Sequence, residues 1–172
     1  MLPIWLVLTA GLALAGWRRA AAAWLAVIAA ALGITLLIKL VLLATDVLAW
    51  ADIRSPSGHT VSATLLEGGL FGLATAARTR PLWQGVGAAL LAGLIVGISR
   101  VMLDNHTVGE VALALPIGLL GAAALLKLQG RPPPGLRLTP ILLTALLATA
   151  ALYGGHSRAE YIIARLAGAV PP

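Results

Sequence analysis

The sequence predicts an all-α integral membrane protein, a polytopic helical bundle of about six transmembrane helices forming a single membrane domain over residues 1–172. Three observations predict this fold class: 60% of the 172 residues are hydrophobic, only 10% are charged, and the apolar residues fall in long runs. A soluble domain of this size needs far more polar surface. Uncharged apolar runs of about 18 or more residues are typical of membrane-spanning helices.

Six apolar runs follow one another along the chain, and we interpret each as one crossing. They cover about residues 2–16, 20–44, 60–77, 82–99, 108–126 and 138–154. The first run is short, but its arginines follow it, whereas a signal peptide carries basic residues before its apolar segment. We therefore expect a retained helix. The prolines at 132–134 predict a loop before the last run.

The basic residues predict the orientation of the chain. Those that follow the first, third and fifth runs have no acidic residue beside them: Arg18, Arg19, Arg78, Arg80, Lys127, Arg131 and Arg137. Loops of this kind stay in the cytoplasm, so both termini are expected outside, with the protein in a bacterial inner (cytoplasmic) membrane. The net charge of +6 is scattered in ones and twos, which argues against a nucleic-acid partner.

Polar residues lie one bilayer thickness away from these basic residues. About 20 helical residues cross about 30 Å of hydrocarbon. The separations are 20, 19, 20 and 17 residues for the pairs Arg19–Lys39, His59–Arg78, Arg80–Arg100 and Glu110–Lys127. We therefore expect Lys39, His59, Arg100, His106 and Glu110 to converge at the outer face.

The first motif precedes the third apolar run, where residues 55–60 read Ser-Pro-Ser-Gly-His-Thr. Ser57 is a good helix cap, Gly58 allows close backbone approach, and a helix N-terminus binds anions. His59 would then lie in the first turn, beside any bound anion. An ordinary turn that caps a membrane helix is an equally good interpretation of this segment alone.

The second motif covers residues 99–110, Ser-Arg-Val-Met-Leu-Asp-Asn-His-Thr-Val-Gly-Glu. Arg100 is suited to gripping phosphate oxygens with two hydrogen bonds. His106 and Glu110 are four residues apart, so on a helix they share one face. A carboxylate behind an imidazole sets its tautomer and leaves the other nitrogen free to attack. The alternative is a solvated loop with a stray histidine.

Together these motifs resemble the type-2 phosphatidic acid phosphatase superfamily, whose pattern is KxxxxxxRP, then PSGH, then SRxxxxxHxxxD. Residues 56–59 match the second block, and Ser99, Arg100 and His106 match the third at the correct spacing. The resemblance covers about residues 35–125, which would be the phosphatase-like core.

The resemblance implies a metal-independent phosphatase without a cofactor, acting through a phosphohistidine. It implies that His106 attacks phosphorus, His59 serves as the general acid and base, and Glu110 orients His106. The phosphate would be held by Lys39, Ser57, Gly58 and Arg100.

Two departures from the family pattern matter. Asp46 occupies the position seven residues after Lys39 where the family has arginine, and no Arg-Pro follows. We take Arg54, in the loop before His59, as the replacement that contacts phosphate; an arginine facing lipid head groups is an equal alternative. Glu110 stands where the family has aspartate, so the His106 ring must be held somewhat differently.

The predicted function is hydrolysis of a membrane lipid phosphate or diphosphate at the outer face. The sequence leaves open undecaprenyl diphosphate, phosphatidylglycerol phosphate, phosphatidate and lipid A phosphates, and it also leaves open the oligomeric state. One alternative is a lipid phosphotransferase with the same site. Another is a non-catalytic lipid-binding or transport protein with a degenerate site, for which the missing Arg-Pro is the main support.

Other polar and aromatic residues have weaker assignments. Glu67 lies inside the third apolar run, where an ionisable group is either functional, paired inside the bundle or protonated. His156 near the C-terminus is expected to have no part in catalysis. Trp17, Trp50 and Trp83 fit anchors at the membrane interface. The chain has no cysteine, which excludes disulfides, thiol catalysis and zinc–thiolate sites.

Overall fold

The computed structural model describes residues 2–76 and 81–151. Within these residues the regular elements are all helical, which confirms the predicted all-α class. They are α1 (Leu2–Leu14), α2 (Arg18–Thr45), the short 3-10 helix η1 (Ala49–Ala51), α3 (Gly58–Thr75), α4 (Leu82–Met102), α5 (Val108–Leu128) and α6 (Leu138–Ala151).

Three of these helices are long and apolar enough to cross a membrane, namely α2, α4 and α5. These helices indicate a membrane protein. Helices α1 and α6 have 13 and 14 residues. Helix α3 has 18 residues but is less apolar, since it contains His59 and Glu67. The six predicted runs correspond to six helices, of which three meet the criteria for a span.

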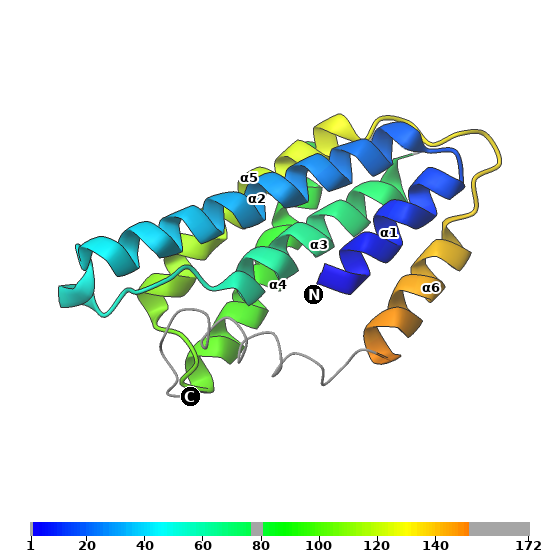
Figure 1. Ribbon diagram of the computed structural model, residues 1–172. Helices are drawn as coiled ribbons and strands as arrows, with labels where there is room; N and C mark the ends of the chain where they lie inside the picture. The colour runs from blue at the N-terminus through cyan, green and yellow to red at the C-terminus, as the bar shows by residue number, and fades with distance from the viewer. Residues whose placement is uncertain (1, 77–80, 152–172) are drawn as a thin grey trace.

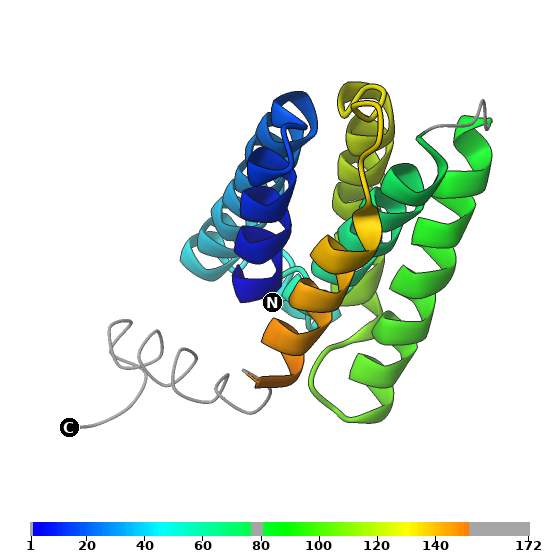
Figure 2. The same cartoon turned by 90° about the vertical axis from the view of Figure 1, so that its right-hand side faces the viewer.

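Successive long helices run in alternating directions, so the connections gather at two ends of the bundle (Figures 1 and 2). At one end, the Arg19 Nε donates a 3.0 Å hydrogen bond to the carbonyl of Leu128, which joins the start of α2 to the end of α5. Lys127 and Arg131 lie at this same end. Arg78 and Arg80 lie outside the described residues. The loops that carry the two motifs, residues 46–57 and 103–107, are at the opposite end.

Glycines set the spacing of α3, α4 and α5. A Cβ on Gly68 would lie 2.5 Å from the Ala122 Cβ, and one on Gly93 would lie 2.2 Å from the Thr64 hydroxyl. Nearer the motif end, a Cβ on Gly97 would meet Val111 at 2.5 Å. The three backbones thus pack as closely as small residues allow in membrane bundles. This register brings the end of α4 level with the starts of α3 and α5.

Large side chains pack the other half of the bundle, where α2 and α6 both contact α1 (Figure 2). Trp24 of α2 is fully buried and lies 5.6 Å from Trp5, centroid to centroid. Trp17 is also buried, at 2% exposure, so its predicted place as an exposed interfacial anchor is wrong; it packs inside the bundle instead. Trp50 and Trp83 are 85% and 71% exposed, as interfacial anchors would be.

Candidate active site

In the turn between α4 and α5, one backbone carbonyl group accepts two hydrogen bonds. The Arg100 carbonyl accepts hydrogen bonds from the backbone N–H groups of Asn105 and His106, at 3.0 and 3.3 Å. Asp104 adopts a left-handed conformation (φ 54°), which reverses the chain just before the histidine. The turn thereby brings His106 back beside the last turn of α4.

A capping box then starts α5. The Thr107 hydroxyl accepts from the backbone N–H of Glu110, and the Glu110 side chain accepts from the backbone N–H of Thr107. This arrangement aims the Glu110 carboxylate back toward His106, whose Nδ1 lies 2.6 Å from the Glu110 Oε2. An ionised carboxylate only accepts hydrogen bonds, so in the neutral imidazole Nδ1 carries the proton and Nε2 has the lone pair.

The loop before α3 docks against the same capping box. The second carboxylate oxygen of Glu110, Oε1, accepts from the backbone N–H groups of Arg54 and Ser55 at 3.0 and 2.8 Å. The Thr107 hydroxyl donates to the carbonyl of Asp52 at 3.2 Å. The N–H of Ser57 donates to the Glu110 carbonyl at 3.2 Å. Two motifs about 50 residues apart in sequence therefore meet at Glu110.

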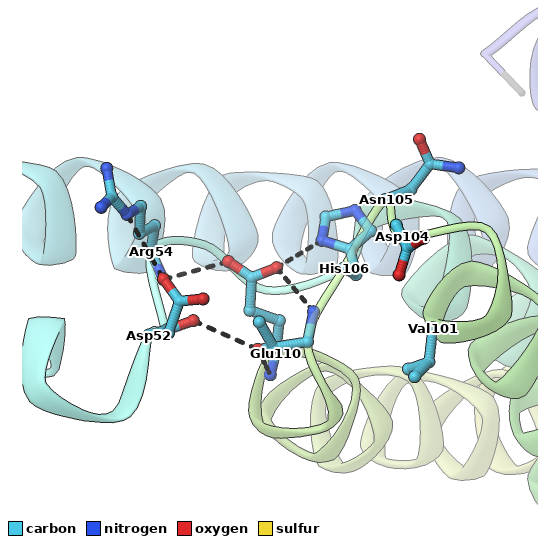
Figure 3. Close-up of a pocket in the computed structure, with 8 residues that line it drawn as sticks. Asp52, Arg54, Val101, Asp104, Asn105, His106 and Glu110 are labelled. Atoms are coloured by element: carbon cyan, nitrogen blue, oxygen red, sulfur yellow. Dashed lines mark hydrogen bonds and ion pairs between the residues drawn. The ribbon is translucent and has the colours of Figure 1, made fainter.

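An open cavity of about 500 Å³ lies over this junction (Figure 3). Its lining residues come from both segments: Asp52, Arg54, Val101, Asp104, Asn105, His106, Thr107 and Glu110. In Figure 3 the Arg54 side chain points away from His106, with the Glu110 carboxylate between them. Its guanidinium forms a 3.7 Å ion pair with Asp52, and both side chains are about three-quarters exposed (74% and 75%).

The remaining predicted site residues are not among those that line the cavity. Arg100 is half-buried in the last turn of α4, and its Nε atom is buried without a hydrogen-bond partner among the described residues. Ser57 is fully buried, and its hydroxyl caps α3 by accepting from the N–H and the hydroxyl of Thr60. Gly58 begins α3, and His59 follows it, half-buried.

Lys39 and Glu67 are exposed. Lys39 lies six residues before the end of α2 and is not among the residues that line the cavity. Its predicted contact with phosphate stays a prediction. Glu67 is exposed on α3, so the structure does not show the pairing inside the bundle that was one of its three interpretations.

Sequence reasoning missed Thr107 and Asp52, which both hold the junction together. Thr107 had a readable signal, since Thr-Val-Gly-Glu at 107–110 fits the capping-box pattern before an apolar run. Asp52 had none, because it takes part through its carbonyl group. Among the described residues, no group of three or more His, Asp or Glu side chains is arranged to hold a metal ion.

Comparison with known proteins finds no family model, no curated protein and no solved structure that matches this chain.

Proposed function

We propose that this protein is a membrane phosphatase that hydrolyses a lipid phosphomonoester or diphosphate through a phosphohistidine intermediate, without a metal ion. The observation that carries the proposal is the 2.6 Å contact between His106 Nδ1 and Glu110, which leaves Nε2 available at the wall of an open cavity. The resemblance of the two motifs to type-2 phosphatidic acid phosphatases supports the same reaction.

The first step transfers the phosphoryl group to the enzyme. The Nε2 lone pair of His106 attacks phosphorus, and the bond between phosphorus and the lipid oxygen breaks. The leaving oxygen takes a proton from His59, which starts this step as imidazolium. Glu110 stabilises the positive charge that develops on the His106 ring. With a diphosphate substrate, the leaving group is the lipid monophosphate.

The second step returns the enzyme to its starting state. Neutral His59 removes a proton from water as the water oxygen attacks phosphorus. The P–N bond breaks and its electron pair returns to His106. The products are the lipid alcohol or monophosphate and inorganic phosphate, and His59 is again protonated.

The buried Arg100 Nε supports a phosphate site next to His106. A buried guanidinium nitrogen without a partner is unfavourable unless an anion completes it. A phosphate would accept that hydrogen bond and neutralise the charge. The start of α3 offers further donors, namely the N–H of Gly58 and the hydroxyl of Ser57, whereas the Ser57 N–H is already bonded to the Glu110 carbonyl. Lys39 and Arg54 are the other proposed cations, and both need a change of side-chain conformation to reach a phosphate beside His106.

Exposed apolar residues support a lipid substrate. Met102, Leu103 and Val108 adjoin cavity residues in sequence, and they are 78%, 60% and 70% exposed. Such side chains are favourable at a membrane interface and unfavourable in water. The cavity would therefore open at head-group level, where a phosphate can enter while the lipid chains stay in the bilayer.

We propose six crossings, with the basic end of the bundle in the cytoplasm and the cavity facing the periplasm. The cations at the start of α2 and at the end of α5 support this orientation. A single cysteine at Asn105 should react with a membrane-impermeant thiol reagent in intact cells, and one at Arg131 should not; the reverse pattern would invert the proposed orientation.

Two alternative functions are each supported by a specific argument. A phosphohistidine does not determine its acceptor, so the same site would serve a lipid phosphotransferase. A non-catalytic lipid-binding or transport protein is favoured by the exposed position of Lys39 and by the missing Arg-Pro. Release of inorganic phosphate by the purified protein separates hydrolysis from both.

The experiment is a phosphate-release screen in detergent with lipid phosphates and diphosphates. The wild type should be active in the presence of chelators, and His106→Ala should be inactive because it lacks the nucleophile. His156→Ala is the matched control and should retain wild-type activity. Full activity of His106→Ala, or activity lost in EDTA and restored by Mg²⁺, would overturn the mechanism.

A further inference from the structure

The start of α5 holds the loop that carries the Pro-Ser-Gly-His motif by four hydrogen bonds. Three of them involve Glu110, through its carbonyl and through the carboxylate oxygen Oε1, and the fourth comes from the Thr107 hydroxyl. Glu110 is 7% exposed, so its three bonds are partly shielded from water, whereas the Thr107 bond is exposed. The loop is therefore fixed to the helix that begins two residues after the nucleophile.

The two oxygens of the Glu110 carboxylate have different partners. Oε1 accepts from the N–H groups of Arg54 and Ser55 at 3.0 and 2.8 Å, whereas Oε2 meets His106 Nδ1 at 2.6 Å and the N–H of Thr107 at 3.4 Å. A carboxylate that only oriented the imidazole would need one of these oxygens. The other oxygen holds a loop two residues upstream of the cap of α3.

We infer that Glu110 is a positioning residue with two separable functions: it orients His106, and it sets the place of the phosphate-binding loop relative to His106. The consequence for catalysis rests on the proposed phosphatase function. The anchoring of the loop does not, because it follows from the hydrogen bonds alone.

The length of the glutamate side chain fits both tasks. Aspartate at this position would be shorter by one carbon–carbon bond, about 1.5 Å. Contacts of 2.6 Å to the imidazole and 2.8–3.0 Å to the loop do not both survive such a retreat. The departure from the family's aspartate is thus explained by the loop that this residue holds.

Glu110→Gln separates the two functions. The two loop N–H groups need an acceptor, so the amide oxygen of glutamine faces them and its NH2 group faces His106. Nδ1 must then accept, which places the proton on Nε2 and removes the attacking lone pair. The loop stays docked while attack fails. Glu110→Ala removes the acceptor for the loop as well, so the loop is released.

The test combines three measurements on the full-length protein in detergent: amide hydrogen exchange of a peptide that contains Arg54 and Ser55, the inhibition constant of inorganic phosphate, and kcat. Inorganic phosphate binds the site without needing the lone pair of His106. Glu110→Gln should keep wild-type exchange and an inhibition constant within about threefold of wild type, with kcat reduced by about 10,000-fold, as expected for a nucleophile held in the wrong tautomer. Glu110→Ala should exchange at least about tenfold faster and bind phosphate about tenfold or more weakly. In exchange rate and in phosphate binding, Glu110→Asp should fall between these two variants.

Two controls complete the design. His106→Ala should lose turnover but keep slow exchange at Arg54 and Ser55. Glu67→Ala changes the same residue type on the exposed face of α3 and should leave exchange unchanged. Slow exchange in Glu110→Ala, or fast exchange in Glu110→Gln, would overturn the inference. If no lipid releases phosphate with the wild type, the proposed function fails, while the exchange pattern still decides whether Glu110 anchors the loop.

Discussion

The two halves of the bundle are packed in different ways. Helices α3, α4 and α5 meet through glycines whose added Cβ atoms would lie 2.2–2.7 Å from a neighbour, as at Gly68, Gly85, Gly93, Gly97 and Gly118. On the other side, α1, α2 and α6 meet through large side chains such as Trp5, Trp24 and Ile141. The outer half of α2 is mostly exposed, including Leu36, Leu37, Leu40 and Leu43.

The half of the bundle that packs through glycines is also the half that carries most of the candidate site. The glycine-packed half carries every candidate site residue except Lys39 and Arg54, and its register determines how the ends of three helices meet. Close backbone packing leaves little room for one helix to slide against another. A reaction that needs His106 placed to within a fraction of an ångström benefits from such a half, whereas the α1–α2–α6 half has no comparable constraint.

The largest effect is expected at Arg100, when compared with Arg18 of the other half. Arg100→Ala should lower kcat/KM at least 100-fold, which corresponds to about 2.7 kcal/mol of lost transition-state stabilisation. Arg18 is exposed at the opposite end, so Arg18→Ala should change kcat/KM less than twofold. Phosphate release under identical detergent conditions measures both.

A second measurement on the same variant tests the cause. The Arg100 Nε is buried without a hydrogen-bond partner among residues 2–76 and 81–151, so removing the side chain should leave the melting temperature unchanged or raise it. A large loss of thermal stability in Arg100→Ala would mean that the arginine supports the fold, and would weaken its assignment to phosphate.

An intermediate effect is expected when the glycine packing is disturbed. Gly93→Ala places a Cβ 2.2 Å from the Thr64 hydroxyl and 2.8 Å from Leu115, and Thr64 is fully buried. Overpacking of this kind costs about 1–3 kcal/mol, against a gain of about 0.5–1 kcal/mol for replacing glycine in a helix. The melting temperature should fall by about 2–8 °C.

Gly87→Ala is the matched control on the same helix, because nothing lies within 4 Å of its added Cβ. It should leave the melting temperature unchanged or raise it slightly. Equal destabilisation by both substitutions would show that glycine packing does not distinguish the two halves, and that α4 needs glycine for another reason.

Much of this architecture could be predicted from the sequence, because the bilayer imposes simple rules. Long apolar runs gave the helices, and the 17- to 20-residue separations from basic residues anticipated that the two motifs meet at one end. Burial of individual residues was less predictable. Trp17 is of the residue type, and at the position, expected of an interfacial anchor, yet it is buried inside the bundle. No sequence pattern predicts such packing.

Within the candidate site, one contact could be predicted from the sequence and another could not. The i, i+4 spacing predicted that His106 pairs with Glu110, and the contact is present. Its cause differs from the expected shared helix face, because His106 precedes the helix and the capping box aims the carboxylate at it. The spacing gave no sign that the second carboxylate oxygen binds the loop at Arg54 and Ser55, since those partners are backbone groups more than 50 residues away. Backbone donors are the same in every residue type, so contacts of this kind leave no trace in composition or spacing.

The smallest effect is expected at Arg54, which tests whether the site lacks one cation. In the structure its guanidinium pairs with Asp52 at 3.7 Å, and the pair is so exposed that it contributes only about 0–1 kcal/mol. Little therefore opposes a rotation of the side chain toward a phosphate beside His106. A charge-assisted hydrogen bond of about 1.5 kcal/mol or more would then form, so Arg54→Ala should lower kcat/KM about tenfold.

Two control variants test the role of Arg54: one keeps its charge but changes its geometry, and the other removes the carboxylate with which it pairs. Arg54→Lys should restore only part of the activity, because a point charge does not reproduce a two-pronged contact. Asp52→Asn removes the competing carboxylate but leaves the carbonyl that accepts from Thr107, so it should keep or slightly raise kcat/KM. If Arg54→Ala retains more than about half of the wild-type kcat/KM while Arg100→Ala is inactive, Arg54 is a surface residue. The glycine-packed half, through Arg100 and the N-terminus of α3, would then hold the phosphate without help from the loop side chain.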